Sequence, residues 1–317
     1  RYFIRISIKR EEIFRQEGWN YHLEQKEGPL KYNGVVYNEM KGAFSSPDEV
    51  LEREIMNHLF PDTTYGCESG GDPKNIPDLT YENFLNFHRT YYHPSNSYIY
   101  LYGNMDMEKK LAFIDEHYLS HFDYLDVDSV IQEQKAFGAC QDVTLEYPVA
   151  ENEGEEDNTY LSYNMVVGNA ADSQMAMAFE VLDYALLSAP GAPLKQALLD
   201  VKAGKDVYGS YDDGILQPYF TVIAKGSNPD RKEEFVSVIR QVLGDIVKNG
   251  IDRKAVEAGI NYFEFRYREA DFSSYPKGLM YSLDILGDWL YEKGNPFAQV
   301  QQLTVLKTEK GSKRRIF

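Results

Sequence analysis

Glu39 is the residue of this 317-residue sequence whose surroundings most suggest chemistry. At about 100° per residue, a helix over residues 34–44 places Glu39 at the border of an apolar arc, one turn from Val35 and one turn from Ala43. No cation stands at helical spacing from it. Because removing an unpaired anion from water is costly, this carboxylate must reach solvent, meet a distant cation, ligate a metal or take up a proton.

The histidines and cysteines complete no metal site in the sequence. No histidine lies in HExxH or HxxEH, the helical arrangements that give a zinc peptidase two imidazole ligands and a base. His117 and His121 are one helical turn apart but have no base between them, so a plain helix end is the preferred interpretation. Cys67 and Cys140 fit no zinc spacing. The nucleophile signature GxSxG, the Walker loop and GxGxxG are absent as well.

The composition restricts the partners. A net charge of -17 argues against binding the phosphates of a nucleic acid, which requires clustered Lys and Arg. No apolar run reaches the length of about 18 residues that a membrane-spanning helix needs. Two cysteines far apart in the sequence are typical of reduced thiols. We therefore predict a cytoplasmic protein with no nucleic-acid partner and no membrane span.

The elements that must position Glu39 are predicted from hydrophobic periodicity. After the helix at 34–44, the sequence favours helices beginning at Ser46 and Thr80. Alternating apolar residues predict strands at 98–102, 143–147, 161–167, 207–211 and 219–224. Strand pairs and helix pairs take turns after residue 140, which predicts an α+β fold with mostly antiparallel sheets and helices packed on one face.

The length permits two domains. Residues 122–140 are acidic and polar without a sustained period, which is typical of a linker. Residues 141–302 contain their own strands and helices and form the second domain. Residues 1–121 contain many helices and few strands, so we interpret them as half of a similar but incomplete domain. Residues 303–317 form an atypical tail, and the chain reads as a piece of something longer.

Several separate stretches also resemble a known family. They occur in order at GVVYNEMKGAFSSPD (34–48), SGGDP (69–73), IPDLT (76–80), FH (87–88), YHPSN (92–96) and YGN (102–104). Together they resemble the insulinase/pitrilysin superfamily, specifically its presequence-protease and falcilysin branch. The resemblance extends over about residues 9–302.

The resemblance implies a role for Glu39. In that family an HxxEH helix supplies two zinc-binding histidines and a general-base glutamate, and a glutamate on a downstream helix supplies the third zinc ligand. Glu39 matches the downstream glutamate, so residues 1–121 would be the C-terminal half of the catalytic-type domain. The HxxEH helix would precede residue 1. No catalytic residue is therefore expected in this chain, and zinc is expected in the complete protein.

The resemblance further implies a zinc metallopeptidase of the inverzincin type, which degrades unstructured peptides inside an enclosed chamber. The chain alone is expected to be inactive. Its expected partners are peptide substrates, the missing N-terminal half-domain and the C-terminal half of the parent protein. The alternative is a non-catalytic peptide-binding or structural member of the same superfamily, which includes subunits that keep the fold without the HxxEH motif.

Overall fold

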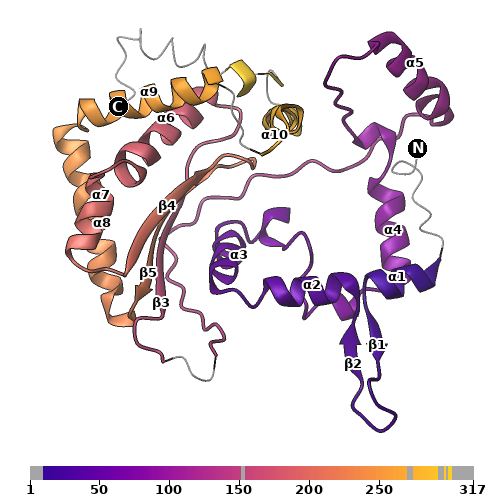
Figure 1. The fold of residues 1–317 in the computed structure, drawn as a ribbon, viewed down its shortest axis with the longest axis horizontal. Helices are drawn as coiled ribbons and strands as arrows, with labels where there is room; N and C mark the ends of the chain where they lie inside the picture. The colour runs from indigo at the N-terminus through magenta and orange to yellow at the C-terminus, as the bar shows by residue number, and fades with distance from the viewer. Residues whose placement is uncertain (1–9, 151–153, 270–273, 292–295, 298, 302–317) are drawn as a thin grey trace. The chain divides into compact units, whose positions relative to one another are not determined.

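A computed structural model describes residues 10–150, 154–269, 274–291, 296–297 and 299–301. The chain divides into two compact units between Pro148 and Val149, and each unit is considered by itself (Figure 1). The predicted tail at 303–317 lies outside the described residues. No helix within the described ranges is long and apolar enough to cross a membrane.

The first unit is built from helices and one short hairpin. Its helices and strands are α1 (Glu11–Glu17), β1 (Asn20–His22), β2 (Lys31–Asn33), α2 (Val35–Ala43), α3 (Pro47–Leu59), α4 (Tyr81–Tyr91) and α5 (Met107–His117). The two strands pair antiparallel, with Tyr21 opposite Tyr32. Because α2 follows this hairpin after a single residue, the hairpin sets the point at which the helix of Glu39 begins.

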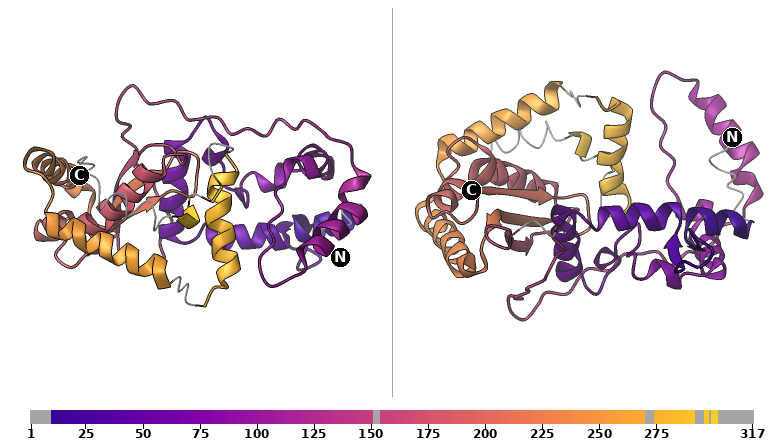
Figure 2. Two further views of the ribbon diagram at one scale, coloured as in Figure 1. Left: turned by 90° about the horizontal axis from the view of Figure 1, so that it is seen from above. Right: turned by 60° about the horizontal axis from the view of Figure 1, so that its bottom comes forward.

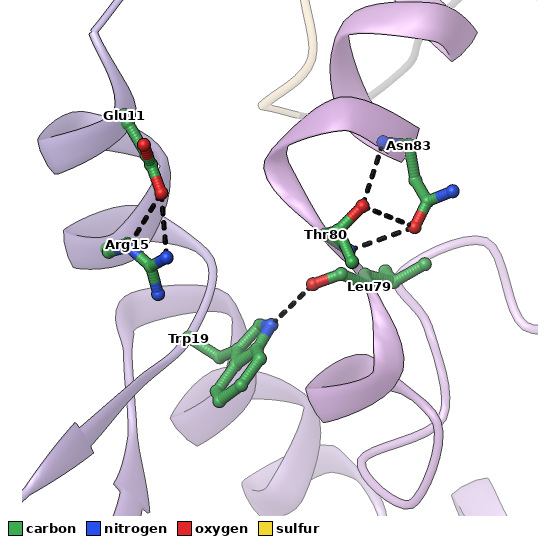
Figure 3. Close-up of polar contacts among 6 residues, drawn as sticks. All are labelled: Glu11, Arg15, Trp19, Leu79, Thr80 and Asn83. Atoms are coloured by element: carbon green, nitrogen blue, oxygen red, sulfur yellow. Dashed lines mark hydrogen bonds and ion pairs between the residues drawn. The ribbon is translucent and has the colours of Figure 1, made fainter.

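The start of α4 is fixed by local and distant hydrogen bonds (Figure 3). The Thr80 hydroxyl accepts from the backbone N–H of Asn83 at 3.1 Å, and the Asn83 side chain accepts from the backbone N–H of Thr80 at 3.0 Å. This is a capping box, which satisfies amides that the first turn leaves free. The Trp19 indole N–H donates to the Leu79 carbonyl at 2.9 Å and so joins the hairpin to the beginning of α4.

Two of the strand predictions are wrong. Residues 98–102 and 143–147 have no regular secondary structure, although their sequences alternate as strands do. A strand is stable only when a neighbour pairs with its backbone N–H and C=O groups. Neither segment is a strand of the two sheets found among the described residues. The apolar side chains of these segments do alternate, but a strand also needs a neighbouring strand, which alternation does not predict.

The predicted linker, residues 122–140, lies within the first unit, is irregular and is hydrogen-bonded to earlier residues of that unit. Figure 2 draws this part of the chain as a long trace without helix or strand. The Gln134 side chain is buried, donates to the Asp62 carboxylate at 2.8 Å and accepts from the Asp62 N–H at 2.9 Å. Earlier in the stretch, the Ser129 hydroxyl donates to the Asn96 side chain at 2.6 Å. These bonds hold part of the stretch against residues about 30 to 70 positions earlier.

The second unit has a three-stranded antiparallel sheet in the order β3-β5-β4. Its helices and strands are β3 (Thr159–Val166), α6 (Ser173–Asp183), α7 (Pro193–Asp200), β4 (Asp206–Asp212), β5 (Tyr219–Ser227), α8 (Lys232–Asn249), α9 (Arg253–Glu269) and α10 (Lys277–Trp289). A π-helical turn, Tyr184–Ser188, continues α6. In the register, Met165 and Tyr211 both pair with Phe220, so three side chains point to one face.

The core of the second unit lies between that face and the helices. Figure 1 shows α6, α7, α8 and α9 gathered on one side of the three strands. Leu198 of α7, Val222 of β5 and Phe235 of α8 are almost completely buried in one apolar cluster. The prediction of a mixed α and β fold with an antiparallel sheet and helices on one face is therefore confirmed.

Candidate functional site

Helix α2 is anchored where it begins. Gly34 precedes its first residue with a φ of +149°, which residues with a side chain rarely adopt. A Cβ at Gly34 would also overlap the Gly18 carbonyl, and the Tyr37 N–H donates to that same carbonyl at 3.2 Å. A glycine is therefore required here for α2 to lie against the segment that leads into β1.

The Gly70-Gly71 pair packs against α2. A Cβ added to Gly70 would overlap the Met40 side chain, and Gly71 has a φ of +93° with its α-carbon facing Ile76. Ile76 is buried, so the loop closes over an apolar contact. The pair therefore forms a tight turn that packs on the helix carrying Glu39.

Glu39 itself is exposed to solvent. It makes no hydrogen bond or ion pair to any residue in the part of the chain that the structure describes. Val35, one turn before it, is 53% exposed, and Val36 is also exposed. Of the four possibilities for this carboxylate, the described residues show the first, contact with solvent. The apolar arc near Glu39 is itself partly uncovered, so the carboxylate is not desolvated.

A cation on α3 contacts the residue that ends α2. The Arg53 guanidinium lies 3.5 Å from the centroid of the Phe44 ring, directly after α2. It also forms an ion pair with Glu54 at 3.5 Å. A guanidinium held over an aromatic ring stays charged and is attracted by the negative ring face. Arg53 thus stabilises the junction of α2 and α3 and is not a counter-ion for Glu39.

The residues present do not by themselves fit a zinc site. No group of three or more His, Cys, Asp or Glu residues suited to a metal occurs within the described ranges. His117 packs edge-on against Phe113, with ring centroids 4.4 Å apart. Structural zinc usually takes four protein ligands and catalytic zinc three. Glu39 offers one donor, and no chemical step can be derived from this chain alone.

The second unit contains a polar cluster that sequence reasoning missed. The Tyr267 hydroxyl on α9 donates to Glu180 Oε2 on α6 at 2.6 Å. Burial raises the pKa of Glu180 to about 7, against the opposing effect of this hydrogen bond. On the same helix, burial raises the pKa of Asp183 to about 6. The two partners of the hydrogen bond are 87 positions apart, so no local pattern could have paired them.

Comparison with known families identifies the class of the chain. The family model described as the peptidase M16 inactive domain matches residues 78–263, which is more than half of the chain. The chain therefore belongs to the M16 peptidase family, a part of the insulinase superfamily. Glu39 lies before the matched region.

Curated relatives narrow the branch. Protein HypA of Clostridium perfringens is 50% identical over 293 residues, which cover 92% of this chain and 30% of that protein. Presequence protease 1, chloroplastic/mitochondrial, of Arabidopsis thaliana is 37% identical over 309 residues, covering 95% of this chain and 28% of that protein. The mitochondrial presequence protease of Xenopus laevis is 32% identical over 295 residues, covering 90% of this chain and 28% of that protein. The chain lies in the presequence-protease branch, as the sequence resemblance predicted.

Solved structures agree on the fold. A peptidase M16 inactive domain from Pseudomonas fluorescens has a TM-score of 0.61 at 17% identity, covering 88% of this chain and 67% of that chain. A protease from Helicobacter pylori has a TM-score of 0.54 at 18% identity, covering 86% of this chain and 66% of that chain. The present chain spans about 30% of the length of the curated relatives that it matches.

Proposed function

We propose that this chain is part of a zinc metalloendopeptidase that degrades unstructured peptides in an enclosed chamber, and that Glu39 is its third zinc ligand. The observation that carries the assignment is the free, exposed carboxylate of Glu39 on a helix whose neighbouring side chains, Val35 and Val36, are also uncovered. Such a surface leaves room for another element that brings the remaining ligands. The HxxEH residues that would complete the zinc site and supply the general base are absent from the sequence.

The relatives support the assignment at the level of the branch. The alignments with the Clostridium and Arabidopsis relatives cover 92% and 95% of this chain. So few residues lie outside them that both aligned regions extend over position 39. Two of the relatives are named presequence proteases. When bound, zinc would polarise a substrate carbonyl and lower the pKa of a bound water. The part assigned to this chain is to present one anionic oxygen from a helix fixed by Gly34.

The assignment of domains and their roles within the chain is also a proposal. Residues 1–121 would be the second half of the catalytic-type domain, 122–140 a linker, and 141–302 a non-catalytic domain of similar architecture. The separation of two compact units supports two domains. The description of the matching family model as an inactive domain supports the non-catalytic role of residues 141–302. The partners would then be the remaining parts of the parent protein and its peptide substrates. Two exposed free thiols, Cys67 and Cys140, support a cytoplasmic location.

The alternative is a non-catalytic peptide-binding or structural member of the family. It is favoured by the matching model's description as inactive and by the lack of a metal-binding group among the described side chains. The two functions differ in one measurable property, because only the first requires stoichiometric zinc.

Glu39→Gln in the longer protein that contains this chain is the direct test. The substitution keeps the size of the side chain and removes its charge as a ligand. We expect zinc affinity to fall by more than roughly 100-fold, since losing an outer partner of a ligand already costs 10-fold to 100-fold. Turnover of a quenched fluorescent peptide should fall with it. Zinc content is measured by mass spectrometry after dialysis, and circular dichroism verifies the fold.

Glu49→Gln is the matched control. Glu49 is likewise an exposed helical glutamate without a hydrogen bond or ion pair among the described residues, but it lies on α3. Its substitution should change stability by no more than about 0.5 kcal/mol and leave zinc and turnover intact. A zinc-replete, fully active Glu39→Gln protein would show that Glu39 is not a ligand. Wild-type protein that binds peptide but holds no zinc would favour the non-catalytic alternative.

A further inference from the structure

Residues 122–134 form a strap along the first unit, without helix or strand. Most of the strap is exposed, but its last side chain, Gln134, is only 7% exposed. Because the strap belongs to neither of the two sheets, no backbone ladder holds it, and its position depends on the individual groups that bind it. Those groups lie at two places, one near the beginning of the strap and one at its end.

The first place is the turn at residues 93–96, which follows α4 and which we call the clasp. The Ser95 hydroxyl accepts from the backbone N–H of Leu125 at 3.1 Å. The Asn96 side chain accepts from the Ser129 hydroxyl at 2.6 Å. The clasp belongs to the YHPSN stretch, to which the proposed function assigns no role. Its polar side chains hold the first half of the strap.

The clasp is a surface contact. The ring of Phe122 meets His93 of the clasp edge-on, with centroids 5.5 Å apart, yet Phe122 is 52% exposed. The two hydrogen bonds of the clasp are exposed as well. Exposed hydrogen bonds contribute little net free energy, because water replaces them when they break. The clasp therefore opens readily unless another contact keeps the strap in place.

The second place is the end of the strap, where a polar side chain is buried. Gln134 donates its amide N–H to Asp62 Oδ2 at 2.8 Å and accepts from the Asp62 backbone N–H at 2.9 Å. Asp62 lies just after α3 and close to Phe60 in the sequence, and Phe60 is fully buried. A buried amide is stable only when it is hydrogen-bonded, and bonds to a carboxylate are stronger than neutral ones. We call this contact the lock.

We propose that the strap is a releasable part of the connection between the two units, and that the lock decides whether it stays on the first unit. While the lock is closed, the free connection begins after Gln134. When the lock opens, the clasp alone does not retain the strap, and the connection gains up to about 45 Å of contour length, at roughly 3.3–3.6 Å for each residue. The inference goes beyond the proposed peptidase function and does not depend on it, because it concerns only the strap and its contacts. It shortens the proposed linker at 122–140 to the residues that follow the lock.

Hydrogen exchange at the backbone amide of Leu125 tests the lock from a distance, because this amide donates to the clasp and not to the lock. It is measured in the longer protein that contains this chain, by mass spectrometry with electron-transfer fragmentation. Gln134→Leu keeps the approximate size and removes the amide, so Leu125 should exchange roughly tenfold faster, as expected for the loss of a hydrogen bond to a charged group. Gln132→Leu is the matched control. Gln132 is exposed and makes no hydrogen bond or ion pair among the described residues, so its substitution should change the rate by no more than about twofold.

Asp62→Ala separates the lock from a local effect of the substitution at Gln134. It removes the carboxylate from the other side of the contact, so Leu125 should again exchange faster. The double variant should exchange no faster than the quicker single variant, because both substitutions remove the same contact. An unchanged rate in either single variant would overturn the lock, as would a double variant in which the two effects multiply, or a wild type in which Leu125 exchanges at its intrinsic rate. If circular dichroism shows that Gln134→Leu does not fold, Asp62→Ala alone decides.

Discussion

The two units of this chain bury their apolar side chains to very different degrees. In the second unit, Leu198, Val222 and Phe235 are almost completely inaccessible between a three-stranded sheet and its helices. In the first unit, Phe60 is fully buried, but Phe87 on α4 is 58% exposed and Tyr92 is 65% exposed. The first unit has only the short hairpin β1-β2 as regular sheet among its described residues.

The difference shows what a sheet contributes to burial. A helix covers one apolar stripe and needs a second layer opposite it. The second unit provides that layer with β3, β5 and β4, whereas the strand-like segments at 98–102 and 143–147 belong to no sheet among the described residues. Similar alternating sequences therefore form a core in one unit and exposed aromatic surface in the other.

Separating the two proposed domains should give the largest effect. We expect a fragment of residues 141–302 to fold cooperatively, because it contains a sheet and the helices that cover it. A fragment of residues 1–121 should aggregate, because its apolar helix faces would remain exposed. Limited proteolysis of the whole chain, read by mass spectrometry, should leave a protected C-terminal fragment. Equal resistance to proteolysis along the whole chain would contradict the expected difference between the two units.

Truncating a phenylalanine in each unit should give the next largest difference. Phe235→Ala leaves a cavity in the core of the second unit and should cost about 3–5 kcal/mol of unfolding free energy. Phe87→Ala removes a largely exposed ring and should cost no more than about 0.5 kcal/mol. Urea unfolding followed by circular dichroism measures both. Equal losses of unfolding free energy in the two variants would mean that the Phe87 side chain is buried in solution.

The smallest expected difference between the units concerns two aspartates whose pKa values are lowered, Asp157 and Asp106. Asp157 accepts from the Asn228 side chain at 2.8 Å and pairs with Lys205 at 3.3 Å, and both interactions lower its pKa. Asp106 caps α5 through Lys109, three residues later, with the same effect on its pKa. Asp157→Asn should lower the melting temperature at pH 7, because it loosens residues 71 positions apart, whereas Asp106→Asn should loosen only the first turn of α5.

The pH dependence of the Asp157 effect checks its cause. A carboxylate with a lowered pKa stabilises the fold above its ordinary value of 3.8, and this contribution is lost as the pH falls through its lower, folded value. The difference between wild type and Asp157→Asn should therefore be full at pH 7 and disappear in strong acid. Melting curves from pH 7 to pH 3 would show this, and a constant difference would attribute the effect to packing instead.

Local sequence predicted much of the fold because local interactions fix it. The helix start at Thr80 and the strands β4 and β5 follow from spacing within a few residues. Short-range patterns also indicated the family. For the candidate site, sequence singled out Glu39 and left four possible environments open.

The tertiary structure decided what surrounds each of these groups. Glu39 contacts solvent among the described residues because the apolar arc beside it has no cover, which a helical wheel cannot show. Residues 98–102 are no strand because pairing depends on another segment of chain. Burial raises the pKa of Glu180, and Asp213 and Asp284, which come from distant positions in the chain, raise it further. Sequence fixes which groups can be charged or apolar, but burial and electrostatics depend on distances that only folding sets.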